Sequence, residues 1–191
     1  MTSNFDPIIS QYFSDGQNNL SKISISDVLV LVNALQAIQL SEKTVFIAGN
    51  GGSASTSSHF ATDIGVGSLH RNNPIRAVSL CDNLAVITAL SNDFSYDLVF
   101  ADQLRLLAKS GDLLLVISAS GNSKNLIEAV KVGRELGIDA YSMTGFDGGE
   151  LRNLTRGRNI HIATPKGAYG LVEDAHLAIC HVITDCLRSL Q

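Results

Sequence analysis

The chain has 191 residues, of which 45% are hydrophobic and 17% charged, and its formal net charge at pH 7 is −4. This length suffices for one well-buried domain and is short for two, and the composition is that of a globular protein rather than a disordered one. The acidic balance, with no run of Lys and Arg, argues against nucleic acid as a partner.

The cysteines and the hydropathy pattern indicate where the protein works. Cys81, Cys180 and Cys186 form no C-x-x-C pair, which favours a reducing compartment over a disulfide framework. No apolar run reaches the roughly 18 residues needed to span a bilayer. The first residues also lack the charged start and apolar core of a signal peptide. We therefore expect a cytoplasmic protein with no membrane partner.

The first 41 residues carry apolar positions at helical spacing. One helix is predicted from about residue 6 to 20, and a second runs to about Leu40 with Ser26 as its N-cap. The apolar face of the second helix is wider than one contact with a sheet needs. This face packs either on the protein's own core or against another subunit. We expect residues 1–41 to be a helical extension involved in oligomer packing.

From residue 44 onward, short apolar runs alternate with helical segments. The segments that read as strands are 44–49, 76–80, 112–118, 139–145 and 159–164. Helices are predicted at about 53–64, 83–91, 122–136 and 170–190, with Gly137 as the residue that ends the third of these. This alternation predicts a single α/β domain with a parallel sheet and helices on both faces.

Two Gly/Ser-rich loops each follow a predicted strand and precede a predicted helix. They are GNGGSAS, residues 49–55, and SASGNS, residues 118–123. Glycines let the backbone approach a ligand closely, and the N–H groups at a helix start suit an anion. Serine hydroxyls add donors without adding charge. Because ligands bind beyond the carboxyl ends of such strands, we expect a small phosphorylated ligand here. The alternative is that both loops are merely tight strand-to-helix turns.

Neither loop has the pattern of a nucleotide site. The G-x-x-x-x-G-K-[ST] motif is absent, and GNGGSA is not a G-x-G-x-x-G fingerprint. The acidic residue expected at the end of the next strand of a dinucleotide-binding unit is also missing. We therefore expect no nucleotide cofactor, and a phosphate held without a lysine clamp.

The order and spacing of five motifs resemble the phosphoheptose isomerases, a branch of the sugar isomerase (SIS) family. The motifs are GNGGSA followed by HF, SND followed by an aromatic residue, SASGNS, TGFDGG (144–149) and EDAHLAICH (173–181). The resemblance runs from about Leu29 to the C-terminus. It implies one SIS domain over residues 1–191, with a flavodoxin-like three-layer α/β/α sandwich around a central five-stranded parallel sheet and N-terminal helices. It also implies a homotetramer with active sites between subunits.

The resemblance implies an aldose–ketose isomerase. Members of the branch convert sedoheptulose 7-phosphate to D-glycero-D-manno-heptose 7-phosphate through an enediol, which serves the synthesis of heptose, lipopolysaccharide or surface-glycan precursors. Many carry zinc, and we expect one zinc or other divalent ion per subunit. By resemblance, the sugar site is lined by Asn50, Gly51, Gly52, Ser53, Asn92, Asp93 and Glu173, and the phosphate is held by Ser118, Ala119, Ser120 and Ser123.

An isomerase of this kind needs a base at carbon and an acid near oxygen. His59 and Asp63 lie four residues apart and share a helix face, whereas Glu173 and His181 lie eight apart on the last helix, an angular offset of about 80°. Two imidazoles and two carboxylates suit zinc, which would polarise the sugar oxygens. We expect these four as metal ligands, Asp63 as the base and His181 as the acid. The alternative for a His/Asp pair at this spacing is a solvated surface pair.

The chain departs from the family pattern at four positions. Asp63 stands where the family has Glu, Ala119 where it usually has Thr, Gly170 where it has Asp, and Glu173 where it has Gln. These departures leave open an isomerase for a different sugar phosphate. A non-catalytic binding protein is a further alternative, like the DnaA initiator-associating protein, a relative that works through protein contacts and lacks the closing histidine. The retained pair of His59 and His181 favours an enzyme.

Three other residues of the last helix are candidates of a lesser kind. His176 and Asp174 are spare metal ligands that we expect to be structural or interfacial. Cys180 is expected to be a buried, small apolar residue rather than a nucleophile.

Overall fold

Strands and helices alternate along the chain, as predicted. The computed structural model describes residues 4–189. In that part of the chain the elements are, in order, α1 (Asp6–Ser21), α2 (Ile25–Leu40), β1 (Thr44–Gly49), α3 (Gly52–Val66), β2 (Arg76–Ser79), α4 (Leu84–Asp93), the 3-10 helix η1 (Tyr96–Leu98), α5 (Val99–Leu107), β3 (Leu113–Ser118), α6 (Lys124–Glu135), β4 (Asp139–Thr144), α7 (Gly149–Leu154), β5 (Asn159–His161) and α8 (Tyr169–Ser189).

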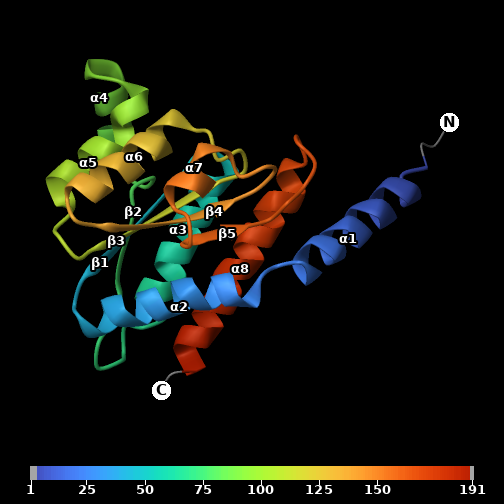
Figure 1. Ribbon diagram of the computed structural model, residues 1–191, viewed down its shortest axis with the longest axis horizontal. Helices are drawn as coiled ribbons and strands as arrows, with labels where there is room; N and C mark the ends of the chain where they lie inside the picture. The colour runs from blue at the N-terminus through green and yellow to red at the C-terminus, as the bar shows by residue number, and fades with distance from the viewer. Residues whose placement is uncertain (1–3, 190–191) are drawn as a thin grey trace.

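The strands form one parallel sheet in the order β2-β1-β3-β4-β5 (Figure 1). β1 pairs with both β2 and β3, so the chain leaves β1 toward one edge of the sheet and returns on the other side of β1. Such a reversal is the switch point at which open α/β sheets bind ligands. The predicted five-stranded parallel sheet is confirmed.

Helices cover both faces of the sheet, which gives three layers. Successive side chains of a strand point to opposite faces. Val45 and Ile47 therefore join the core under α2, α3 and α8, whereas Phe46 and Ala48 join the core under α5, α6 and α7. The predicted three-layer α/β/α sandwich is confirmed.

Some element boundaries differ from the predictions. α2 begins at Ile25 because Ser24 is extended and its hydroxyl accepts the N–H of Asp27; the predicted cap, Ser26, instead hydrogen-bonds to Ser24. η1, α5 and α7 were not predicted. Gly137 has φ of +73°, which confirms it as the residue that ends α6. The last helix was predicted to reach Leu190, which lies outside the described residues.

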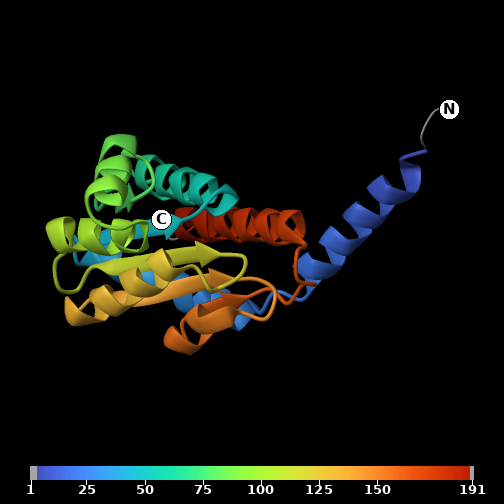
Figure 2. The same ribbon diagram turned by 90° about the horizontal axis from the view of Figure 1, so that it is seen from above.

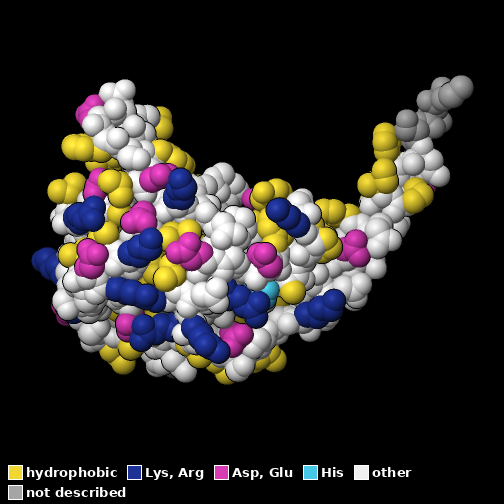
Figure 3. Space-filling model, turned by 45° about the horizontal axis from the view of Figure 1, so that its top comes forward, with side chains coloured by type: hydrophobic (Ala, Val, Ile, Leu, Met, Phe, Trp, Pro, Cys, Tyr) yellow, Lys and Arg dark blue, Asp and Glu magenta, His cyan; other side chains and the backbone are white. Residues whose placement is uncertain are grey.

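The helix α1 extends away from the sandwich (Figure 2), and its large apolar side chains are exposed. Phe13 is 71% exposed and Ile8 68%. Hydrophobic side chains follow the projecting arm in Figure 3. Within residues 4–189 no single helix is long and apolar enough to cross a membrane; α1 and α2 meet that test only as a pair, bent by 68°. The role of residues 1–41 in oligomer packing stays a prediction.

Candidate active site

The two Gly/Ser loops lie at the same edge of the sheet, on either side of the switch point. Gly49, the last residue of β1, is in register with Ile117 of β3, and β3 ends one residue later at Ser118. The helices that follow, α3 and α6, both start at this edge. In α3 the N–H groups of Ser53, Ala54 and Ser55 bond to carbonyls of Asn50 and Gly51, and in α6 those of Leu126 and Ile127 bond to the carbonyl of Ser123. Among the described residues this leaves the N–H groups of Gly52, Lys124 and Asn125 open to a ligand. The structure confirms the predicted position of both loops.

An amide pair ties the first loop to the start of α6. Asn50 and Asn125 each donate from Nδ2 to the other's Oδ1 at 2.9 Å, and the hydroxyl of Tyr96 donates to Oδ1 of Asn50 at 2.7 Å. Gly51 turns the chain with φ of +56° and ψ of −124°, a conformation that side chains disfavour. Asn50 therefore ties the first loop to the start of α6, the helix that follows the second loop. Asn125 and Tyr96 are site residues that sequence analysis missed, and no motif surrounding them would have revealed them.

The serines of the second loop divide into internal supports and open donors. Ser118 is buried, and its hydroxyl accepts the N–H of Gly121 at 3.0 Å. Ser120 accepts the N–H of Asn122 at a longer 3.3 Å. Ser123 precedes the first residue of α6 but makes no capping hydrogen bond there. Its hydroxyl is therefore unengaged at the helix start, while the hydroxyls of Ser118 and Ser120, which only accept in these bonds, each keep an O–H that can donate to a ligand.

Ala119, the position at which the family usually carries Thr, has a packing role in this chain. It is only 6% exposed and forms a small apolar cluster with Phe146 and Val172. Its carbonyl accepts the N–H of Gly145 at 3.1 Å. Any contact of Ala119 with a phosphate would therefore come from its backbone N–H.

The TGFDGG segment supports the second loop from behind. Gly121 has φ of +66°, and a Cβ on it would collide with the carbonyl of Gly148. The carbonyl of Gly121 accepts the N–H of Leu151 at 2.9 Å, and Oδ1 of Asn122 accepts the N–H of Glu150 at 3.0 Å. This close backbone packing holds the loop in one shape.

A cavity of about 230 Å³ opens beside the second loop. Its lining includes a lysine, Lys166, together with Ser120, Asn122, Phe146, Asp147 and Thr164. The expectation of a phosphate held without a lysine clamp stays a prediction. Lys166 follows the last strand, so its place at the carboxyl edge of the sheet was the signal that sequence analysis could have used.

His59, Asp63 and His181 meet where α3 and α8 run side by side. Nε2 of His59 lies 3.2 Å from Nε2 of His181 and 3.2 Å from Oδ2 of Asp63, and Nε2 of His181 lies 4.0 Å from the same oxygen. All three ligand atoms lie within 4.8 Å of one another. Two imidazoles and a carboxylate in this arrangement fit a divalent ion such as zinc.

Glu173, the fourth predicted ligand, is not part of that group. It precedes His181 by eight residues of α8, which is about 12 Å along a helix. Its carboxylate lies over Gly52, where a Cβ would collide with it. Gly52 and Ser53 open α3, so the Glu173 carboxylate lies at the positive end of that helix.

Tyr12 brings α1 to the start of α8. Its hydroxyl donates to Oδ2 of Asp174 at 2.6 Å, and a Cβ on Gly170 would lie 2.6 Å from the same hydroxyl. The hydrogen bond to Asp174 is the main cause that raises the pKa of Tyr12, with a smaller contribution from the charge of Glu173. Sequence analysis missed Tyr12, which lies more than 150 residues from its partner.

Asn92 and Asp93 are the last residues of α4 rather than a turn, and both are exposed. Among residues 4–189 their side chains hydrogen-bond only to each other, at 2.8 Å. Tyr96, shortly after them, is the residue that reaches the first loop. Contact of Asn92 and Asp93 with a sugar stays a prediction.

Two residues on the inner face of α8 are buried, as expected. His176 is fully buried, and neither ring nitrogen has a hydrogen-bond partner in the described part of the chain. Burial lowers the pKa of His176 to about 4. Cys180 is also fully buried, which raises the pKa of its thiol and leaves it unsuited to act as a nucleophile.

Comparison with known proteins identifies the family. The sequence model of the SIS domain matches residues 11–145. The chain belongs to the SIS domain family. The probable phosphoheptose isomerase of Thermoplasma acidophilum is 30% identical to this SIS protein over 173 residues, 91% of this chain and 93% of that one. The phosphoheptose isomerase of Dechloromonas aromatica is 35% identical over 147 residues, 76% and 74% of the two chains.

Solved structures agree with this grouping. The phosphoheptose isomerase of Neisseria gonorrhoeae superposes with a TM-score of 0.87 at 27% identity, over 98% of this chain and 100% of that one. The enzyme of Francisella tularensis gives 0.85 at 26% identity, over the same shares. This SIS protein therefore lies in the phosphoheptose isomerase branch, and the predicted resemblance is confirmed.

Proposed function

We propose that this SIS protein is a cytoplasmic aldose–ketose isomerase that converts sedoheptulose 7-phosphate to D-glycero-D-manno-heptose 7-phosphate. The observation that carries the proposal is the group of His59, Asp63 and His181, which stands on the helix that follows the first Gly/Ser loop and on the helix beside it. The full-length relatives that bear the name phosphoheptose isomerase support it. The product would feed the synthesis of heptose-containing surface glycans such as lipopolysaccharide.

The second loop is assigned to the phosphate. Ser123 and the first N–H groups of α6 supply donors without a counter-charge, and Lys166 supplies a cation from the adjoining cavity. Ser118 and Ser120 keep the loop in shape through their bonds to Gly121 and Asn122. Holding the phosphate fixes the sugar, so that binding energy remote from the reacting carbons is used for orientation.

Asp63 and His181 are assigned to proton transfer. Asp63 takes the proton from C1 of the ketose, and the C1–H bonding electrons form the C1–C2 double bond of an enediol as O2 gains a proton from His181, through Nδ1 when an ion would occupy Nε2. Asp63 then gives its proton to C2 and His181 takes the O1 proton, which yields the aldose and returns both residues to their starting protonation, so atoms and charge balance. Oδ2 of Asp63 faces both imidazoles, which leaves the other oxygen for the substrate.

A divalent ion, most simply zinc, fits the same three side chains. Two imidazole nitrogens and one carboxylate oxygen are a common zinc set that keeps a position open for a substrate oxygen. When bound, such an ion polarises the sugar oxygens. Glu173 would join it only by leaving its place over Gly52.

We further propose a homotetramer in which α1 packs against another copy and sites lie between subunits. Apolar side chains that are exposed next to one another mark interaction surfaces. Phe5, Ile8, Ile9 and Phe13 on and beside α1 are each at least half exposed. The partial exposure of His59 and His181, 45% and 52% of their side chains, leaves room for a second subunit to cover the site.

A second candidate is an isomerase of a different sugar phosphate. The observation that favours it concerns Gly170, which stands where the family carries Asp. In this chain the hydroxyl of Tyr12 occupies the space beside Gly170. A tyrosine hydroxyl thus lies where relatives have a carboxylate, which changes the polar groups at the start of α8.

The deciding experiment is an assay of the purified protein on sedoheptulose 7-phosphate, with and without added zinc, by product chromatography. Formation of the heptose would support the proposal. A folded, metal-loaded protein that leaves this substrate unchanged but isomerises a shorter ketose phosphate would establish the second candidate instead. Inactivity on both would favour a binding role.

A further inference from the structure

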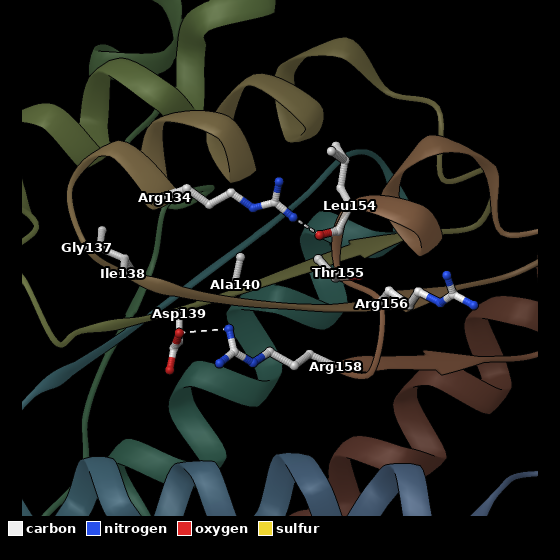
Figure 4. Close-up of a pocket in the computed structure, with 9 residues that line it drawn as sticks. All are labelled: Arg134, Gly137, Ile138, Asp139, Ala140, Leu154, Thr155, Arg156 and Arg158. Atoms are coloured by element: carbon white, nitrogen blue, oxygen red, sulfur yellow. Dashed lines mark hydrogen bonds and ion pairs between the residues drawn. The ribbon is translucent and has the colours of Figure 1, made fainter.

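The amino edge of the sheet, opposite the two Gly/Ser loops, carries a second hollow. Its volume is about 360 Å³, within the range of small-molecule sites. Figure 4 shows it between the end of α6, the start of β4 and the segment that follows α7. The lining residues are Arg134, Gly137, Ile138, Asp139, Ala140, Leu154, Thr155, Arg156 and Arg158.

Three arginines on this hollow are notable because the chain as a whole is acidic, with a net charge of −4. Arg158 is paired with Asp139 at 2.7 Å, and its guanidinium lies 5.6 Å from the ring centre of Tyr141. Arg134 donates to the carbonyl of Leu154, where α7 ends. These contacts hold two guanidiniums in place while leaving most of their N–H donors unused.

Arg156 is the unpaired cation of the group. Within residues 4–189 it forms no ion pair and no side-chain hydrogen bond. It is a lining residue of the hollow, but in Figure 4 its side chain extends outward, away from Arg134 and Arg158. The charges that oppose it are the carboxylate of Asp139, which Arg158 neutralises, and the negative ends of α6 and α7, one of which Arg134 caps. The balance on the hollow is therefore positive.

The backbone adds a donor at the bottom of the hollow. The N–H of Ser142 bonds to the carbonyl of Arg158, and the carbonyl of Thr144 accepts from Ile162, so even-numbered residues of β4 direct their polar groups toward β5. β5 pairs with β4 only from Ser142 onward. The N–H of Ala140 therefore faces the hollow without a strand to pair with, as an arginine-flanked backbone donor.

We propose that this hollow is a second anion site that binds a small phosphorylated molecule, separate from the substrate phosphate at the second loop. Guanidiniums bind phosphate oxygens through paired N–H donors. A phosphate monoester would supply the negative counter-charge that the Arg156 guanidinium does not have within residues 4–189. Ile138, Ala140 and Leu154 give the remainder of the ligand an apolar surface.

Hydrogen–deuterium exchange of the full-length protein with inorganic phosphate as the probe tests the proposal. We expect protection of residues 134–141 and 154–158 as well as 118–124. Arg156→Ala should weaken the phosphate effect on 134–141 and 154–158 by about tenfold or more in half-saturating concentration. In the same variant, the protection of residues 118–124 should remain. In the control variant Arg105→Ala, which changes an exposed arginine of α5, the protection of all three segments should remain.

Because Arg156 is exposed and makes no ion pair or side-chain hydrogen bond within residues 4–189, its removal should leave folding intact, which circular dichroism of the same sample checks. A second variant, Arg156→Glu, should abolish the effect at the hollow. Protection confined to 118–124 would overturn the proposal. So would equal protection by chloride at matched ionic strength, or protection at the hollow that survives both variants.

Discussion

The His59–Asp63–His181 group and the Ser118–Ser123 loop present different kinds of chemical group to a ligand. The group consists of charged or titratable side chains on the outer faces of α3 and α8, about half exposed at both imidazoles. The loop consists of backbone N–H groups and neutral hydroxyls, held in place by the TGFDGG segment. Side chains of the first kind move protons, whereas fixed donors of the second kind position an anion.

The comparison predicts different kinetic consequences. Changes to the group should lower kcat, and changes to the loop should raise KM. A result that reverses this division would show that the roles assigned to the two regions are exchanged or shared.

The largest effect is expected from His181→Ala. Removing the proposed acid should lower kcat for sugar-phosphate isomerisation by about 10²- to 10⁴-fold while KM changes little. Zinc bound per chain, measured by mass spectrometry, should fall as well, because one of three ligand atoms is lost. His70→Ala, at an exposed histidine away from the group, is the matched control. Unchanged kcat in His181→Ala would remove the group from the chemistry.

The next effect concerns His176, which lies between Glu173 and His181 on the buried face of α8. Its pKa of about 4 in the folded state is below the ordinary 6.5, so above pH 6.5 the side chain is neutral in both states. As the pH falls below 6.5, the unfolded chain binds a proton that the folded chain cannot. The free energy of unfolding should then fall by about 3 kcal/mol by pH 4, since each pKa unit is about 1.4 kcal/mol.

Urea unfolding between pH 7.5 and pH 4 measures this contribution, and His176→Leu provides the comparison. The variant keeps an apolar side chain of similar size in the cavity but cannot bind a proton. Its stability should therefore decline less steeply with acid than that of the original protein. Parallel curves for the two proteins would show that another group causes the acid sensitivity.

A smaller effect is expected in the loop. Ser123→Ala removes a hydroxyl that has no capping role in α6, so stability should hold while KM rises about tenfold with kcat unchanged. Ser110→Ala, at the opposite edge of the sheet, should change neither value. A fall in kcat without a change in KM would place Ser123 with the catalytic group instead.

Sequence patterns predicted the sheet, both loops and the His59–Asp63 pair, because each depends on residues close together in the chain. A buried run such as 112–118 marks a strand by itself, and a spacing of four marks a helix face. The meeting of His181 with His59 needed the family resemblance, since the residues are 122 positions apart. The contact of Asn125 with Asn50 was missed because no local pattern marks it. Lys166 beside Ser120 was missed although its place after the last strand put it at the carboxyl edge of the sheet.

Glu173 shows a limit of spacing arguments. An offset of about 80° leaves two side chains near one helix face, but their separation of eight residues also carries them about 12 Å apart along the axis. Where the carboxylate lies then depends on neighbours from other elements. Here the absent side chain of Gly52 leaves the space that the carboxylate of Glu173 fills.

The smallest effect tests whether α1 contributes to the rim of the site. Tyr12→Phe removes only the hydroxyl that donates to Asp174, an exposed hydrogen bond to a charged group. If that bond positions the start of α8 and with it Glu173, KM should rise about threefold to tenfold with kcat and zinc content unchanged. Asp174→Asn in the same background completes a double-mutant cycle, and the two changes together should cost no more than one alone. Additive effects would mean that Tyr12 and Asp174 act separately. The hydrogen bond between α1 and α8 would then play no part in substrate binding, which would rest on the His59–Asp63–His181 group and the Ser118–Ser123 loop alone.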